Sequence, residues 1–185
     1  MITLICGPMF SGKSTELIRQ LERKHIAGKK TLYIRPNLDS RDFVARGYSG
    51  NLSEITDIIE VNDFNESHDS IVEWVNKYDS IFVDEYFMIP HCDLICKILP
   101  DEDHRCDIYF GGLLSTAENA IWPEAVNILP YCDDIVKLNA VCTHCGSEHA
   151  NYSMFKGEKK QTLVIGDGTY TAVCRKCYGL LKGHL

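Results

Sequence analysis

The sequence has 185 residues and a formal net charge of −7. This length allows one main core with a small second lobe, and 24% charged with 45% hydrophobic residues is ordinary for a folded protein. The acidic balance argues against a nucleic-acid partner. No run of about 18 apolar residues and no basic, signal-like start is present, so the sequence predicts no membrane association and a cytoplasmic location.

The first fifteen residues combine an apolar run, a glycine turn and the start of a helix. Residues 2–6 are of strand length, and the apolar residues that follow Thr15 recur at helical spacing. The segment between them satisfies G-x-x-x-x-G-K-[ST], in which backbone N–H groups and the helix N-terminus hold phosphate oxygens. Lys13 would serve the outer phosphates, and the Ser14 hydroxyl would ligate Mg²⁺. The predicted phosphate site comprises Gly7, Pro8, Met9, Phe10, Ser11, Gly12, Lys13, Ser14 and Thr15.

Short apolar runs then alternate with amphipathic segments. Residues 35–50 mix Pro, Gly and Arg without periodicity and predict a surface loop. Strands are predicted at 31–34, 58–61, 80–85, 107–113 and 135–141, and helices at 67–76, 93–99 and 122–129. The strand at 107–113 is expected to end in a glycine turn at Gly111 and Gly112. The alternation predicts an α/β fold, a P-loop NTPase-like parallel sheet flanked by helices, within a nucleotide-binding domain at 1–140.

Two carboxylates, Asp84 and Glu85, end the apolar strand at 80–85. In phosphate-loop enzymes an acid at such a strand end reaches Mg²⁺ or its waters, and an adjacent acid can take a proton from the attacking nucleophile. Asp84 fits the metal role, and Glu85 fits the role of general base. The competing interpretation, two surface acids that cap a strand, is disfavoured by the phosphate loop in the same chain.

The nine cysteines divide into scattered residues and two C-x-x-C pairs. The pairs, Cys142 with Cys145 and Cys174 with Cys177, form a set typical of a closed structural Zn²⁺ site, which would stabilise a small lobe at 141–185. His144 and His149 are then expected to face solvent. The scattered cysteines are predicted to be core thiols: Cys6, Cys92, Cys96, Cys106 and Cys132.

Between the two pairs, residues 162–170 form an apolar run that breaks into a glycine-rich loop ending in Tyr170. Such a loop can fold over a flat ligand. A plain hairpin turn explains the pattern equally well.

Taken together, these motifs resemble the thymidine kinases of the cellular and poxviral type. The resemblance covers nearly the whole chain. It rests on GPMFSGKST at 7–15, on Asp39-Ser40-Arg41, on VKLNAVC at 136–142, and on VIG at 164–166 with Tyr170 and CRKCY at 174–178. It implies a homotetrameric kinase that uses ATP, Mg²⁺ and structural zinc to phosphorylate the 5′-hydroxyl of a deoxynucleoside, thymidine first.

The resemblance also implies residue roles. Glu85 would be the general base, Lys13 and Arg41 would stabilise the transferring phosphoryl group, and Asp39 would belong to the nucleotide site. The base would be enclosed by residues from several segments, with Tyr152 and Ser153 beside it: Met9, Leu113, Thr162, Leu163, Val164, Ile165, Gly166 and Tyr170.

Departures from the family pattern gather in the base-reading part. A Gln usual after the acidic pair is Phe87, an aromatic that stacks on thymine is Ala117, and an Arg after Ser153 is Phe155. Either Trp122 or Phe87 compensates for the missing ring, or the pocket accepts another base. Two alternatives therefore stay open: a kinase with a different acceptor, and a non-catalytic nucleotide-binding zinc protein. A retained Glu85 beside a complete phosphate loop favours turnover.

Overall fold

The computed structural model describes residues 1–38, 48–99, 106–156 and 169–183. A six-stranded sheet in the order β3-β2-β4-β5-β1-β6 forms its centre, and every neighbouring pair is parallel. The strands are β1 (Ile2–Cys6), β2 (Thr31–Pro36), β3 (Asp57–Val61), β4 (Ser80–Asp84), β5 (Asp107–Gly112) and β6 (Asp134–Lys137). The predicted α/β fold with a parallel sheet is confirmed.

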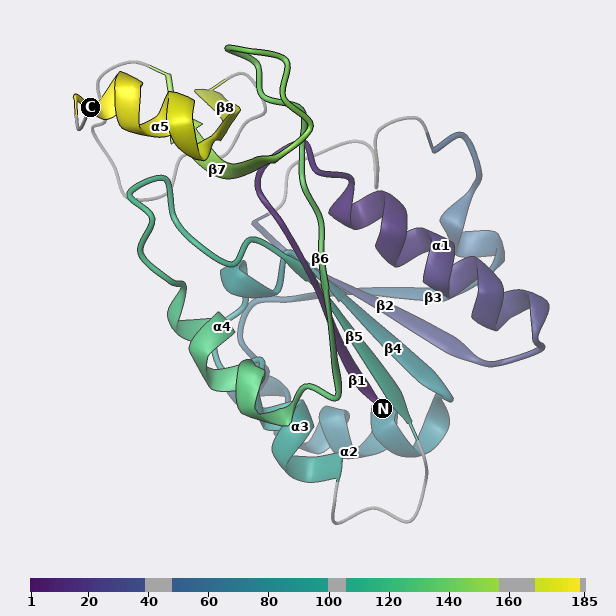
Figure 1. The fold of residues 1–185 in the computed structure, drawn as a ribbon. Coiled ribbons are helices and arrows are strands. Elements are labelled where there is room, and N and C mark those ends of the chain that lie inside the picture. The colour runs from purple at the N-terminus through teal and green to yellow at the C-terminus, as the bar shows by residue number, and fades with distance from the viewer. Residues whose placement is uncertain (39–47, 100–105, 157–168, 184–185) are drawn as a thin grey trace.

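Helices cover both faces of this sheet (Figure 1). On one face lies α1 (Lys13–Ile26), which buries Leu17, Ile18 and Leu21 at helical spacing. The other face is covered by α2 (His68–Lys77), α3 (Leu94–Ile98) and α4 (Pro123–Ile128). Pro123 is the first residue of α4. A backbone N–H at this position would have no hydrogen-bond partner within the helix, so the helix loses nothing by having a proline there. No helix in the described ranges is long and apolar enough to cross a membrane.

A small second unit lies beyond the carboxyl ends of the sheet strands (Figure 1). It contains the antiparallel pair β7 (Ala150–Phe155) and β8 (Tyr170–Cys174), followed by α5 (Arg175–Lys182). Its buried residues form a cluster of their own: Ala140, Cys142, Ala150, Ala172, Val173 and Cys177. The helix α5 was not predicted.

Two sequence predictions were wrong in detail. Gly111 and Gly112 do not form a turn but complete β5. Glycine is needed at both positions because other elements pack closely against them: a β-carbon on Gly112 would lie 2.8 Å from the Tyr86 ring, and one on Gly111 would lie 3.0 Å from Leu17. The strand predicted at 135–141 ends at Lys137. Beyond it the chain crosses to the small unit, where Ala140 pairs with Ala150.

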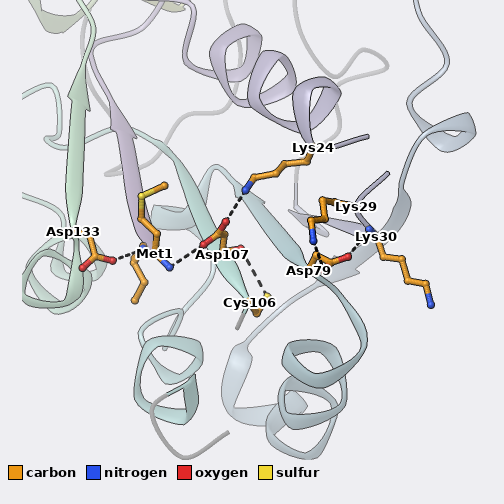
Figure 2. A network of polar contacts seen from close by, with 9 residues as sticks. Met1, Lys24, Lys29, Lys30, Asp79, Cys106, Asp107 and Asp133 are labelled. Carbon is orange, nitrogen blue, oxygen red and sulfur yellow. Dashed lines mark hydrogen bonds and ion pairs between the residues drawn. The ribbon is translucent and has the colours of Figure 1, made fainter. Parts of the chain in front are cut away.

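Polar contacts tie the amino ends of the strands together (Figure 2). The Met1 amino group and Lys24 Nζ donate to the two oxygens of Asp107 at 2.9 and 2.6 Å. Burial alone would raise the pKa of Asp107, but these hydrogen bonds and charges outweigh it and hold the pKa below its ordinary value. In the same region Asp79 accepts the backbone N–H of Lys30 at 2.9 Å.

Candidate active site

The phosphate loop joins β1 to α1 at the carboxyl edge of the sheet. It turns through left-handed backbone at Phe10 (φ 65°) and Gly12 (φ 83°). The loop also needs Gly7, because a β-carbon there would lie 2.6 Å from the carbonyl oxygen of Leu138. The Lys13 side chain is 7% exposed and donates to the carbonyl of Pro8 at 2.8 Å. The predicted cationic group therefore lies inside the loop rather than in solvent.

Ser14 and Asp84, the two predicted Mg²⁺ ligands, lie in contact. Ser14 Oγ donates to Asp84 Oδ1 at 3.3 Å, which links the first turn of α1 to the end of β4. Asp84 is 2% exposed, and its other oxygen accepts a hydrogen bond from the Tyr33 hydroxyl at 2.7 Å. A hydroxyl and a carboxylate are the oxygen donors that Mg²⁺ takes from proteins, so this donor set fits the ion.

Glu85 leaves the end of β4 in an unusual backbone conformation. Its φ of 48° and ψ of 42° are left-handed, which is uncommon for a residue with a side chain and is often found at functional sites. Its backbone N–H donates to Asp84 Oδ1 at 3.0 Å. The turn separates the half-buried Glu85 side chain from the strand that buries Asp84, so the two neighbouring acids occupy different environments.

The small unit contacts the phosphate loop through Ser153. Its Oγ accepts the backbone N–H of Met9 at 2.9 Å, across 144 positions of sequence. Ser153 is 5% exposed, and Met9 is half-buried. Two residues predicted to lie beside the base are thereby brought together at the junction of the two units.

The segment after β5 carries three further residues predicted to lie at the base: Leu113, Ala117 and Trp122. It folds back on itself, with Ser115 bridging Ile121. Its backbone is held at Leu113, whose carbonyl accepts from the Tyr86 hydroxyl at 2.8 Å, and at Ala117, whose carbonyl accepts from the Tyr178 hydroxyl at 3.3 Å.

Two of the residues that depart from the family pattern, Phe87 and Ala117, are buried. The Phe87 ring is 8% exposed, and its centroid lies 5.0 Å from that of Trp122. The pair therefore packs mainly against itself and the core. Ala117 is 8% exposed as well, so the position that carries a stacking aromatic in the family pattern is enclosed here.

The hairpin end carries Tyr170, whose ring packs edge-on against Phe155 with centroids 5.4 Å apart. The remaining predicted site residues lie outside the described residues: Asp39, Arg41, Thr162, Leu163, Val164, Ile165 and Gly166.

The four paired cysteines converge as the spacing predicts. Their sulfur atoms all lie within 4.8 Å of one another, and the Cys145 and Cys174 sulfurs are 3.7 Å apart. Four sulfurs placed tetrahedrally at about 2.3 Å from Zn²⁺ would be roughly 3.8 Å apart, so the cluster has the dimensions of such a site. Gly146, with φ 74°, makes the turn that follows the first pair.

The pKa values of two thiols in the cluster are shifted in opposite directions. Burial opposes ionisation of Cys142, but the backbone N–H groups of Cys174, Cys145 and His144 donate to its sulfur and lower its pKa to about 6. Burial, followed by hydrogen bonds to the other three sulfurs, raises the pKa of Cys177 to about 12. His144 and the nearby His149 are exposed, as predicted. The five scattered cysteines are buried or half-buried, also as predicted.

Sequence reasoning missed two tyrosines at this site. Tyr33 orients Asp84, and Tyr178 joins the second cysteine pair to the Ala117 segment while its ring stacks on that of Tyr152 at 4.6 Å. The CRKCY match could have pointed to Tyr178. Nothing in the sequence signals Tyr33, because its partner is 51 positions away.

Comparison of the sequence with known proteins points to one family. The thymidine kinase family model matches residues 1–178. The thymidine kinase of Acanthamoeba polyphaga mimivirus is 30% identical over 98% of this chain and 83% of that protein. Those of vaccinia virus and Pseudothermotoga lettingae are each 32% identical, over 96% of this chain and 96% and 94% of those proteins. The chain therefore belongs to the thymidine kinase family of enzymes.

Proposed function

We propose that the protein transfers the γ-phosphoryl group of ATP to the 5′-hydroxyl of thymidine, giving dTMP, in a reaction that requires Mg²⁺. The observation that carries this proposal is the contact between Ser14 Oγ and Asp84 Oδ1 at 3.3 Å, directly beside Lys13. It joins the start of α1 to the end of β4, the two places from which phosphate-loop enzymes hold phosphates and the metal. The family match supports the substrate class.

The phosphate-binding roles follow from the loop. Backbone N–H groups of residues 7–15 would bind phosphate oxygens, and Lys13 would exchange its bond to Pro8 for the outer phosphates. Ser14 and Asp84 would hold Mg²⁺, which when bound neutralises charge on the phosphate oxygens. By family resemblance we assign Asp39 to the nucleotide site and Arg41 to the charge of the transferring group.

We assign the proton transfer to Glu85. A half-buried carboxylate directly after the metal-binding acid is suitably located to accept the 5′-hydroxyl proton as the nucleophile attacks. The left-handed backbone at Glu85 supports a functional role, since such a conformation persists only where the surrounding structure holds it.

The base is proposed to lie where the two units meet. Met9 and Ser153 join there, and the Tyr178 hydroxyl holds the backbone of Ala117 from the small unit. The remaining contacts of the proposed pocket are Leu113, Trp122, Tyr170 and residues 162–166.

The enclosed Ala117 favours a second candidate, a nucleoside kinase with relaxed base selectivity. Ala117→Phe should tighten thymidine binding by up to about 1–3 kcal/mol if the pocket has room for a ring that stacks on the base. If Trp122 fills that space, binding should weaken instead. An unchanged KM for thymidine would place position 117 outside the pocket.

We further propose that the four cysteines bind one structural Zn²⁺ per chain and that the chain divides at residue 140. The dimensions of the cluster and the separate core of the small unit support this. A homotetramer is proposed from the family resemblance alone. Nine cysteines of which none forms a disulfide suit a reducing, cytoplasmic location.

Product analysis tests the proposed reaction. Incubation with thymidine, ATP and Mg²⁺ should give a monophosphate that co-elutes with 5′-dTMP, and chelation of Mg²⁺ should stop its formation. A 3′-phosphate, or ADP formed equally fast without nucleoside, would contradict the proposal.

A further inference from the structure

Tyr33 reaches Asp84 from the neighbouring strand of the sheet. In the parallel pairing of β2 with β4, Tyr33 lies opposite Phe82, and Asp84 follows two residues later on the same face of β4. The Tyr33 ring is 1% exposed and belongs to the buried cluster that contains Leu17 and Leu21 of α1. Close packing therefore fixes the ring, and with it the position of the hydroxyl that donates to Asp84.

The two oxygens of Asp84 are held by contacts of different strength. Oδ2 accepts the Tyr33 hydroxyl at 2.7 Å in a buried contact. Oδ1 accepts the Ser14 hydroxyl at 3.3 Å in a half-buried contact, and the Glu85 N–H at 3.0 Å. A short O–H···O bond to a carboxylate is stronger than a long one. An arriving cation would therefore displace Ser14 from Oδ1 more readily than it would displace Tyr33 from Oδ2.

The number of carboxylate oxygens open to a cation affects which cation a site selects. Mg²⁺ requires a near-ideal octahedral shell at about 2.0–2.1 Å, whereas Ca²⁺ takes about six to eight oxygens at longer distances and often binds both oxygens of one carboxylate. A carboxylate with one oxygen engaged elsewhere therefore fits Mg²⁺ better than Ca²⁺. Partners that orient a metal ligand commonly change metal affinity by about 10- to 100-fold.

We propose that Tyr33 is a positioning residue that makes the nucleotide–metal site selective for Mg²⁺ over Ca²⁺. Its hydroxyl holds Asp84 Oδ2, so that Oδ1, on the side of Ser14, is the oxygen presented to the cation. Tyr33 acts through Asp84 and not by contact with the metal. The proposal rests on the proposed function, because it takes Ser14 and Asp84 as the metal-binding pair.

Equilibrium binding of a non-hydrolysable ATP analogue, AMP-PNP, tests the proposal without turnover. Calorimetry is run with the nucleotide saturated by Mg²⁺ and, separately, by Ca²⁺, so that the ratio of the two affinities reports the selectivity of the protein. We expect the wild-type protein to bind the Mg²⁺ complex about tenfold more tightly, or better.

Tyr33→Phe keeps the ring and its packing while the hydroxyl is lost. Its affinity for the Mg²⁺ complex should fall by about tenfold, because Asp84 is no longer held in one orientation. Its affinity for the Ca²⁺ complex should change by no more than about twofold, because Ca²⁺ can use the released Oδ2. The selectivity ratio should therefore be largely lost.

Tyr78→Phe is the matched control. The Tyr78 hydroxyl also donates to an aspartate, Asp57, but Tyr78 precedes β4 and so lies at the opposite end of this strand from Asp84. This variant should keep the wild-type ratio. Thermal unfolding checks that both variants are folded, and the wild-type ratio tests the proposal without any variant.

Three results separate this proposal from the proposed function. Affinities for both complexes that fall in the same proportion in Tyr33→Phe would mean that the hydroxyl only supports the fold, and would overturn the proposal. Equal wild-type affinities for the two complexes would overturn it as well, and both results leave the proposed function intact. If chelation of all divalent ions left the wild-type affinity for AMP-PNP unchanged, Ser14 and Asp84 would not hold a metal, and the proposed function would fail together with this proposal.

Discussion

Removing the hydroxyl of Ser153, which belongs to the small unit, should disturb the phosphate loop to which it is hydrogen-bonded. In Ser153→Ala the Met9 N–H loses its acceptor at 2.9 Å, at a position where Ser153 is only 5% exposed. An unpaired buried donor costs about 1–3 kcal/mol. If the unpaired donor destabilises the active site rather than the folded protein as a whole, kcat/KM for thymidine should drop by about 5- to 150-fold, since 1.36 kcal/mol is a factor of ten.

The assay is steady-state kinetics with thymidine and ATP varied separately, alongside thermal unfolding. A cost that falls on folding should lower the midpoint by about 2–4 °C per kcal/mol for a chain of this size. Ser53→Ala, which alters an exposed serine whose hydroxyl donates to Asn51 Oδ1 at 2.8 Å, is the control. If Ser153→Ala matched this control in both measurements, the contact would have no role in holding the loop.

Three other variants test the remaining parts. Glu85→Gln should lower kcat by about 10²–10⁴ with ATP affinity nearly unchanged, and wild-type turnover would exclude a general-base role. Cys145→Ser should abolish the one zinc per chain found by metal analysis and lower the thermal midpoint, whereas zinc-free wild-type protein would refute the site. Asp107→Asn should cost about 1–2 kcal/mol near neutral pH by removing the ionic contacts of Asp107 with the Met1 amino group and Lys24, which Figure 2 shows. Because the pKa of Asp107 is lowered in the folded state, this stabilisation is present above the unfolded pKa and lost as pH falls through the folded pKa; a difference from wild type that stays constant in acid would contradict this.

The features that sequence predicted well are those whose partners are close in the chain. The predicted strand, loop and helix around residues 7–15 are present because the three elements follow one another directly along the chain. Each cysteine pair likewise sets its own local geometry, although the meeting of the two pairs depends on the β7–β8 hairpin.

The features that sequence missed depend on distant partners. Gly111 and Gly112 suggested a turn, but the space they leave is filled by Leu17 and Tyr86 from other elements. The hydroxyl of Tyr33 reaches Asp84 only because β2 and β4 are neighbours in the sheet. No local pattern carries that information.

The base-reading part shows the same limit. The substitution at Phe87 was visible in the sequence, but its burial against Trp122 was not. Whether the replaced aromatic is compensated depends on packing around Ala117, which sequence periodicity does not describe. The backbone of the loop at residues 7–15 was therefore easier to predict than the packing of the base-reading segment.

The most direct test of the central claim is a panel of deoxynucleosides incubated with γ-labelled ATP and Mg²⁺. Thymidine, deoxyuridine, deoxycytidine, deoxyadenosine and deoxyguanosine are compared by kcat/KM, with Lys13→Ala as the background. We predict label in the monophosphate product with thymidine as the preferred acceptor. No acceptor labelled above the Lys13→Ala background would contradict the account, and preference for a purine would refute the proposed base pocket.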